Sequence, residues 1–248
     1  MTDDISLEIE TADPPETNLV VAFPGPGMGA ISANQYLIEQ LGLEETGHVR
    51  AEGLAAVTPF ADGRPYHHTR LFTSESLECT LLTSELPIPT HLTEPFGRIL
   101  LEWVEDNGVD EVTVLTTMPT LASDDLFYVA SEDYYDRRLA DRSESLSLSP
   151  LTGGFFTGVN ASLTSRAIDT DLRVGVLATA VERPHVLDGD AALRLVEGLQ
   201  EIYEFDVDTD ELRQFADRTR DHYRELVEQV EAQTRAQQRP AVEDRGFM

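Results

Sequence analysis

The sequence contains no lysine, and all 18 of its basic residues are arginines. P-loop enzymes and kinases place a lysine on the nucleotide phosphates, and pyridoxal enzymes form a Schiff base with one. The chain therefore fits none of these classes in its usual form. Cysteine is nearly absent too, since Cys79 stands alone. One cysteine excludes a disulfide framework or a cysteine metal cluster within the chain.

Long apolar runs are also missing. No stretch approaches the roughly 20 apolar residues that a membrane-spanning helix needs. The first residues, Met1-Thr2-Asp3-Asp4, are acidic where a secretion signal would be basic. We therefore expect a soluble, cytoplasmic protein, whose 41% of hydrophobic residues over 248 positions suffice for a substantial core.

Positive charge is scarce. Asp and Glu number 46, which gives a formal net charge of -28, and the acids are spread along the whole chain. Molar salt screens repulsion to within a few ångströms, and a carboxylate surface stays hydrated there. The composition predicts a halophilic protein, with an ordinary acidic protein as the alternative. It makes nucleic acid and anionic membranes poor partners, because both need a basic face.

Short β-rich apolar runs alternate with amphipathic segments of helical period. This alternation is typical of βαβ units. It predicts an α/β fold, doubly wound, in which helices flank a largely parallel central sheet and a pair of helices closes the chain. Strands are expected at 18–23, 47–57, 66–72, 78–86, 112–116, 126–130, 143–149 and 172–178, and helices at 30–41, 92–104, 132–141, 159–168, 188–203 and 208–231.

The two ends of the chain differ from its middle. Residues 1–17 are acidic and predict a flexible arm, and residues 18–206 predict the α/β core domain. Residues 207–231 predict a C-terminal helix whose narrow apolar stripe packs on the body of the chain or forms a subunit interface. Residues 232–248 are polar and predict a disordered tail.

A glycine-rich turn follows the first apolar run, in V-V-A-F-P-G-P-G-M-G-A-I-S. Gly25, Gly27 and Ala30 match a permissive dinucleotide fingerprint, but no carboxylate or arginine stands at the end of the next strand. Pro26 has no amide to offer a phosphate. We interpret the turn as a tight strand-to-helix corner. In the alternative, a small-molecule enzyme or nucleotide-binding protein uses two glycine loops, formed by Gly25, Gly27 and Gly29 and by Gly153, Gly154 and Gly158.

No set of residues predicts catalysis or metal binding. The six histidines show no metal-ligand spacing, and His67 and His68 on one strand would face opposite ways. His185 and Asp188 are better explained by a loop hydrogen bond and a helix cap than by an acid–base pair. We expect a protein without enzymatic activity, cofactor or metal.

The order of several blocks resembles the archaeal proteasome assembly chaperone family. The resemblance covers roughly Asn18 to Glu228, and no single block is diagnostic. The blocks are F-P-G-P-G-M-G-A-I-S-A-N-Q-Y-L, T-S-E-L-P-I-P, L-L-E-W-V-E-D-N-G-V-D-E-V-T-V-L, T-G-G-F-F-T-G-V-N, L-D-G-D-A-A-L-R-L-V-E-G-L and V-D-T-D-E-L.

The resemblance implies a doubly wound α/β domain that forms homo-oligomers and binds proteasome α-subunits in place of catalysis. Some members end in a hydrophobic–tyrosine–any tripeptide that docks between α-subunits. Here the chain ends Gly246-Phe247-Met248, so Phe247 keeps the ring without the hydroxyl and Gly246 is not hydrophobic. Phe247 and Met248 are the candidate partner-binding residues. A stand-alone oligomer with an unrelated partner remains a third interpretation.

Overall fold

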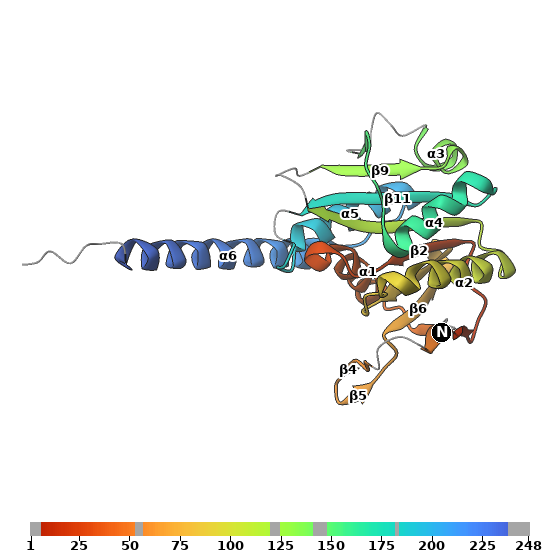
Figure 1. The fold of residues 1–248 in the computed structure, drawn as a ribbon, viewed down its shortest axis with the longest axis horizontal. Coiled ribbons are helices and arrows are strands. Elements are labelled where there is room, and N and C mark those ends of the chain that lie inside the picture. The colour runs from red at the N-terminus through yellow and green to blue at the C-terminus, as the bar shows by residue number, and fades with distance from the viewer. Residues whose placement is uncertain (1–5, 53–56, 120–124, 141–147, 182–183, 238–248) are drawn as a thin grey trace, which may run out of the picture.

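A nine-stranded sheet forms the centre of the molecule (Figure 1). The computed structural model describes residues 6–52, 57–119, 125–140, 148–181 and 184–237. The strands of the sheet are β1 (Ser6–Thr11), β2 (Asn18–Ala22), β3 (Glu45–Glu52), β6 (Thr69–Ser74), β7 (Cys79–Ser84), β8 (Glu111–Pro119), β9 (Leu126–Ala130), β10 (Leu148–Pro150) and β11 (Arg173–Val181).

The strands lie in the order β1-β3-β6-β7-β2-β8-β11-β9-β10. The central strands β7, β2, β8 and β11 are parallel, and β6 joins β7 as the expected antiparallel hairpin. All five residues of β2 are buried, as are eight of nine in β11, because helices cover both faces of the sheet. Continuous apolar runs are typical of strands in that position. The predicted α/β fold is confirmed.

Helices lie on both faces of the sheet and build two separate cores. Helices α1 (Gly29–Gln40) and α5 (Gly189–Tyr203) pack on one face, where Leu37 and Leu195 meet Val20 of β2. Helices α2 (Thr93–Asp106) and α4 (Gly158–Asp169) cover the other face, where Phe96 and Leu163 are buried. The short α3 (Glu132–Arg138) follows β9. No helix of the described residues is long and apolar enough to cross a membrane.

The flexible arm predicted for residues 1–17 is wrong for Ser6–Thr11. These residues form β1, an edge strand that pairs antiparallel with β3. Leu7 and Ile9 pack against the core on the α2 side, and Glu8 between them is exposed. This alternation is that of a half-buried strand, and its non-local partner could not be read from the acidic composition.

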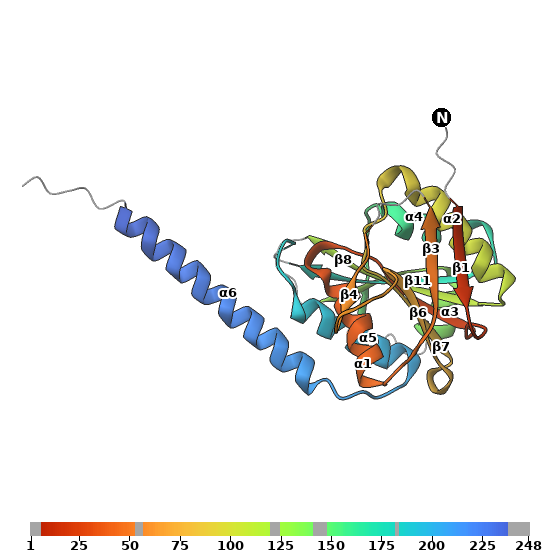
Figure 2. The same cartoon turned by 90° about the horizontal axis from the view of Figure 1, so that it is seen from below.

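Helix α6 (Asp210–Gln237) starts on the body and then projects away from it (Figures 1 and 2). Leu212 and Ala216 are buried, and Arg213 Nη2 lies 2.8 Å from Glu197 Oε1 of α5. The apolar stripe therefore packs on the body over its first turns. Disorder was predicted from residue 232, but residues 232–237 continue the helix, so that prediction is wrong there.

A small hairpin protrudes from the body below the sheet in Figure 1. It consists of β4 (Phe60–Ala61) and β5 (Arg64–Pro65). Its Phe60 side chain is 78% exposed. The predicted strand at 66–72 is irregular over 66–68 and belongs to β6 from Thr69 on. The predicted strand at 143–149 is described only from Leu148.

Candidate functional site

The glycine turn packs between β8 and the segment that leads into α5. The Gly27 amide donates to the Pro184 carbonyl over 2.9 Å, and the Gly27 carbonyl accepts from the Asp188 amide over 2.9 Å. Thr117 Oγ1 of β8 donates to the Pro26 carbonyl over 2.6 Å. The Asp188 carboxylate, in turn, accepts from the Ala191 amide over 2.9 Å and caps α5. These backbone groups of the turn are bound within the chain.

Close packing accounts for the three glycines of this turn. A Cβ atom on Gly25 would lie 3.0 Å from Thr117 Oγ1, and one on Gly29 would lie 2.8 Å from Ala191 Cβ, where α1 and α5 meet. Gly27 has a φ of +67°, which favours glycine. Packing and backbone conformation therefore explain why each of these positions is glycine, without a bound ligand.

We expect Gly27→Ala to lower the free energy of unfolding by roughly 1–2 kcal/mol, because it adds backbone strain and a tight contact. The new Cβ would lie 3.0 Å from Asp188 Cβ. Gly42→Ala is the matched control, since Gly42 has a φ of +61° and open space around it. Chemical denaturation compares the two, and Gly27→Ala should be the more destabilised.

The same proteins test the nucleotide alternative. Nucleotides and dinucleotides should leave the melting temperature of the wild-type chain unchanged. A nucleotide-dependent rise that Gly27→Ala abolishes, and Gly42→Ala preserves, would contradict the packing explanation.

The second glycine loop lies on the opposite face of the sheet. Thr116 accepts a hydrogen bond from Asn160 of α4 over 3.2 Å, whereas the next residue, Thr117, bonds the glycine turn. Adjacent strand residues point to opposite faces. The two loops therefore lie at the same end of β8 but on opposite faces of the sheet.

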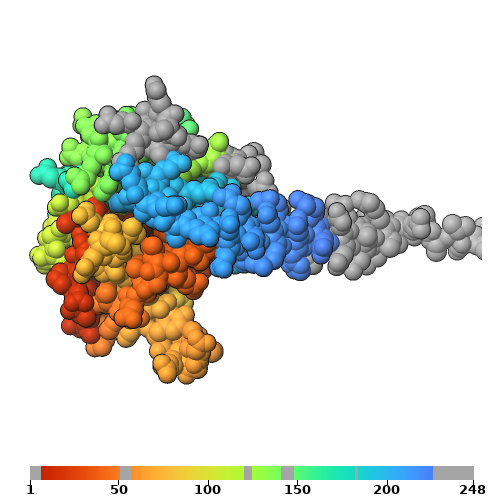
Figure 3. Space-filling model, turned by 180° about the vertical axis from the view of Figure 1, so that it is seen from behind, coloured from red at the N-terminus to blue at the C-terminus, as the bar shows by residue number. Residues whose placement is uncertain are grey.

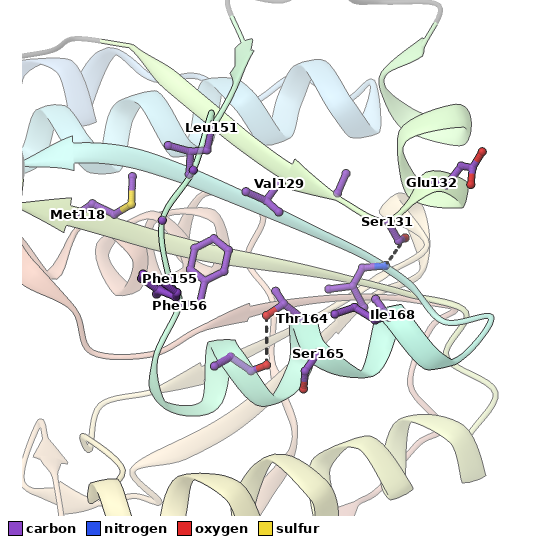
Figure 4. Close-up of a pocket in the computed structure, with 16 residues that line it drawn as sticks. Met118, Val129, Ser131, Glu132, Leu151, Phe155, Phe156, Thr164, Ser165 and Ile168 are labelled. Carbon is purple, nitrogen blue, oxygen red and sulfur yellow. Dashed lines mark hydrogen bonds between the residues drawn. The ribbon is translucent and has the colours of Figure 1, made fainter.

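The loop between β10 and α4 borders an apolar groove of about 780 Å³ (Figure 4). This volume is in the range of small-molecule pockets. Gly153 and Gly154 line the groove, but Gly158, at the start of α4, is not among its lining residues. The other lining residues come from the same loop and from β8, β9, α3, α4 and β11, and include Met118, Val129, Leu151, Phe155, Phe156 and Ile168.

The hydroxyl side chains that line this groove make hydrogen bonds inside the protein. Ser131 Oγ accepts from the amides of Tyr134 and Val174. Thr164 Oγ1 donates to the Asn160 carbonyl over 2.9 Å. Of the lining residues only Glu132 carries a formal charge. The groove therefore offers apolar surface and few directed polar groups.

A fully buried carboxylate, Glu111, lies at the beginning of β8 among three arginines. Its Oε1 accepts from Arg138 Nε over 2.7 Å and from the Tyr203 hydroxyl over 3.1 Å. Its Oε2 lies 3.6 Å from Arg137 Nε and 3.5 Å from Arg173 Nε. This cluster was not predicted from the sequence, although an acid at the start of the apolar run at 111–115 could have indicated it.

Two tyrosines, the buried Tyr134 and the partly buried Tyr203, complete this ionic cluster. Thr113 Oγ1 lies 2.8 Å from the Tyr134 hydroxyl and 2.7 Å from the Tyr203 hydroxyl. Burial raises the pKa of both tyrosines, so both stay neutral. The Arg138 guanidinium lies 4.4 Å from the centre of the Tyr203 ring. The cluster links β8, α3 and α5. Its hydrogen bonds and ion pairs connect elements of the fold, as expected of residues that stabilise the structure.

The histidines do not assemble a metal centre among the described residues. His48 and His67 stack with ring centroids 3.7 Å apart. Burial, followed by the proximity of His48, lowers the pKa of His67. Cys79 is buried in β7, and burial raises its pKa to about 12, which keeps it a thiol.

The candidate partner-binding residues Phe247 and Met248 lie outside the described residues. The last described element before them is α6, which carries the chain away from the body (Figure 3). Residues 238–248 follow its last residue, Gln237. Their role stays a prediction.

Residues 19–227 match the PAC2 family. The chain belongs to the PAC2 family. Among proteins with curated descriptions, none matches this PAC2 chain. The family assignment agrees with the resemblance found in the sequence blocks, and it covers β2 through most of α6.

Solved structures with the same fold include proteins related to proteasome assembly. Pyrococcus furiosus PbaA, described as an archaeal homologue of a proteasome-assembly chaperone, superposes with a TM-score of 0.78 at 19% identity, covering 94% of this chain and 96% of PbaA. Pyrococcus furiosus PbaB, an archaeal proteasome activator, gives 0.75 at 14% identity, over 89% and 98%. A Mycobacterium tuberculosis proteasome-assembly chaperone homologue gives 0.61 at 16% identity, over 85% and 94%. At these identities the likeness establishes the fold.

Proposed function

We propose that this PAC2 protein is a non-catalytic, proteasome assembly chaperone-like protein that binds proteasome α-subunits or the α-ring as a homo-oligomer. The observation that carries the proposal is the family match over residues 19–227. Full-length similarity of fold to PbaA supports it. The glycine turn supports the non-catalytic part, because its Gly27 amide and carbonyl are bound within the chain.

The proposal also covers the conditions in which the protein acts. We infer a salt-rich cytoplasm, in a haloarchaeal cell, from a net charge of -28 and the use of arginine alone as the base. At ~1 M salt the Debye length is about 3 Å, so carboxylates beyond direct neighbours no longer repel one another strongly. Binding experiments therefore belong in molar KCl.

A pull-down with purified α-subunits tests the partner. We expect the tagged full-length chain to retain α-subunits in molar KCl. A chain ending at Gln237 removes residues 238–248 and keeps all of α6, so it isolates the contribution of the terminal segment. Loss of binding assigns the contact to that segment, and full retention assigns it to the body or α6. If neither chain retains α-subunits, the proposed partner is wrong.

A further inference from the structure

The apolar groove beside α4 carries its own protruding aromatic side chain. Phe155 is 100% exposed and Ile168 of α4 is 81% exposed, and both border the groove. Phe155 lies on the loop that crosses the strands in Figure 4. One face of the molecule thus has both a protruding apolar side chain, Phe155, and an apolar groove that this side chain does not fill.

The loop backbone holds Phe155 on the surface. Gly154 has a φ of +149°, which favours glycine, and a Cβ atom at Gly153 or Gly154 would meet nothing within 4 Å. Close packing therefore explains neither glycine, in contrast to the turn at Gly25. The conformation at Gly154 turns the chain so that the next side chain leaves the body.

The chemistry of the groove favours an apolar occupant. Ser131, Thr164 and Ser165 use their hydroxyls for hydrogen bonds within the chain, the last with the Ser162 carbonyl over 3.0 Å. A polar ligand would lose its hydration there without gaining matched partners. A large apolar side chain makes no hydrogen bonds with water, so it gives up none when it enters the groove.

The scarcity of charge around the groove suits a second copy of this acidic chain as its occupant. Each copy carries a net charge of -28, and in molar salt acids brought into direct contact across an interface still repel one another. The groove has a single acid, Glu132, among its 16 lining residues, whereas the whole chain has 46 acids in 248 positions. This face is therefore a place where two copies approach with little repulsion.

We propose that two copies of the chain associate through this face, with Phe155 of each copy inserted into the groove of the other. A projection and a matching hollow on the same face make a self-complementary surface, and such a surface produces a two-fold dimer. The inference rests on the proposed self-association and assigns it a surface and central residues. The contact with α-subunits is left to other parts of the molecule, such as α6 and the residues after it.

Native mass in molar KCl tests this contact with Phe155→Ser and a matched control, Phe60→Ser. Phe60 is also a highly exposed aromatic, but it lies on the β4–β5 hairpin and does not line the groove. We expect the wild type and Phe60→Ser to show twice the 27.5 kDa of one chain. Phe155→Ser should raise the dimer dissociation constant at least ~30-fold, as for a central interface aromatic.

A second substitution, Ile168→Glu, places a charge on the rim and should have the same effect as Phe155→Ser. Circular dichroism checks that each variant is folded. If the wild type associates and neither variant weakens it, the surface is wrong while the proposed self-association stands. If the wild type stays monomeric at every concentration, self-association itself is wrong, and the α-subunit pull-down still decides the proposed partner.

Discussion

Replacing Glu111 with alanine is expected to lower the free energy of unfolding by about 3–5 kcal/mol, because it leaves buried positive charge without a partner. Arg138 keeps 14% of its side chain exposed and donates from Nε to Glu111 Oε1 over 2.7 Å. Without that carboxylate, the hydrogen bond that Arg138 keeps within the described part of the chain is to Asn18 Oδ1, over 3.1 Å. The Tyr203 hydroxyl also loses an acceptor.

Chemical denaturation at constant salt measures this effect, with Glu102→Ala as the control. Glu102 also pairs with an arginine, at 2.8 Å, but both side chains are more than half exposed. Exposed helix pairs contribute about 0.3–0.5 kcal/mol. If Glu111→Ala and Glu102→Ala lowered the free energy of unfolding equally, the buried cluster would contribute no more to stability than an exposed ion pair.

A double variant separates two effects of Glu111→Ala: the loss of the attraction between Glu111 and its arginines, and the cost of leaving Arg138 buried without a partner. Arg138→Met in the Glu111→Ala chain removes the guanidinium that the first change leaves behind. It should recover part of the stability, because an apolar side chain needs no partner in a buried site. A further loss on adding Arg138→Met would assign the role of Arg138 to its packing on the Tyr203 ring.

The parts of the fold that the sequence predicts are those fixed by local pattern. Asn18–Ala22 and Arg173–Val181 are apolar runs bounded by turns, and both are central strands. The start of α5 was predicted from Asp188, whose carboxylate caps the helix as expected. In each case neighbouring residues carry enough information, since burial period and capping are local properties.

The features that the sequence misses depend on distant partners. Ser6–Thr11 became a strand because it pairs with β3, some forty residues away in the chain. Glu111 gained its role from Arg138 and Tyr203, which reach it from two helices. The candidate groove needs five elements to form, so the sequence could supply Gly153 and Gly154 but not the apolar hollow beside them.

Gly175→Ala is expected to lower the free energy of unfolding by about 3 kcal/mol, at the upper end for an overpacked core. Gly175 is the third residue of β11 and lies under the ring of Tyr134, and an added Cβ would overlap that ring at Cζ and Cε1. The ring cannot turn aside freely. Tyr134 is 1% exposed, and its hydroxyl is held 2.8 Å from Thr113 Oγ1. A displaced ring would also leave a buried hydroxyl without its partner.

Denaturation of two further variants gives this prediction its test. Gly153→Ala is the same substitution in open space, so it should change the free energy of unfolding by less than ~0.5 kcal/mol. In a Tyr134→Leu chain the clash with the ring is absent, and adding Gly175→Ala should cost less than ~1 kcal/mol. The difference between the two backgrounds is the coupling between Gly175 and the ring. Equal costs in both backgrounds would mean that glycine is required at this position for its backbone, and that the contact with Tyr134 is incidental.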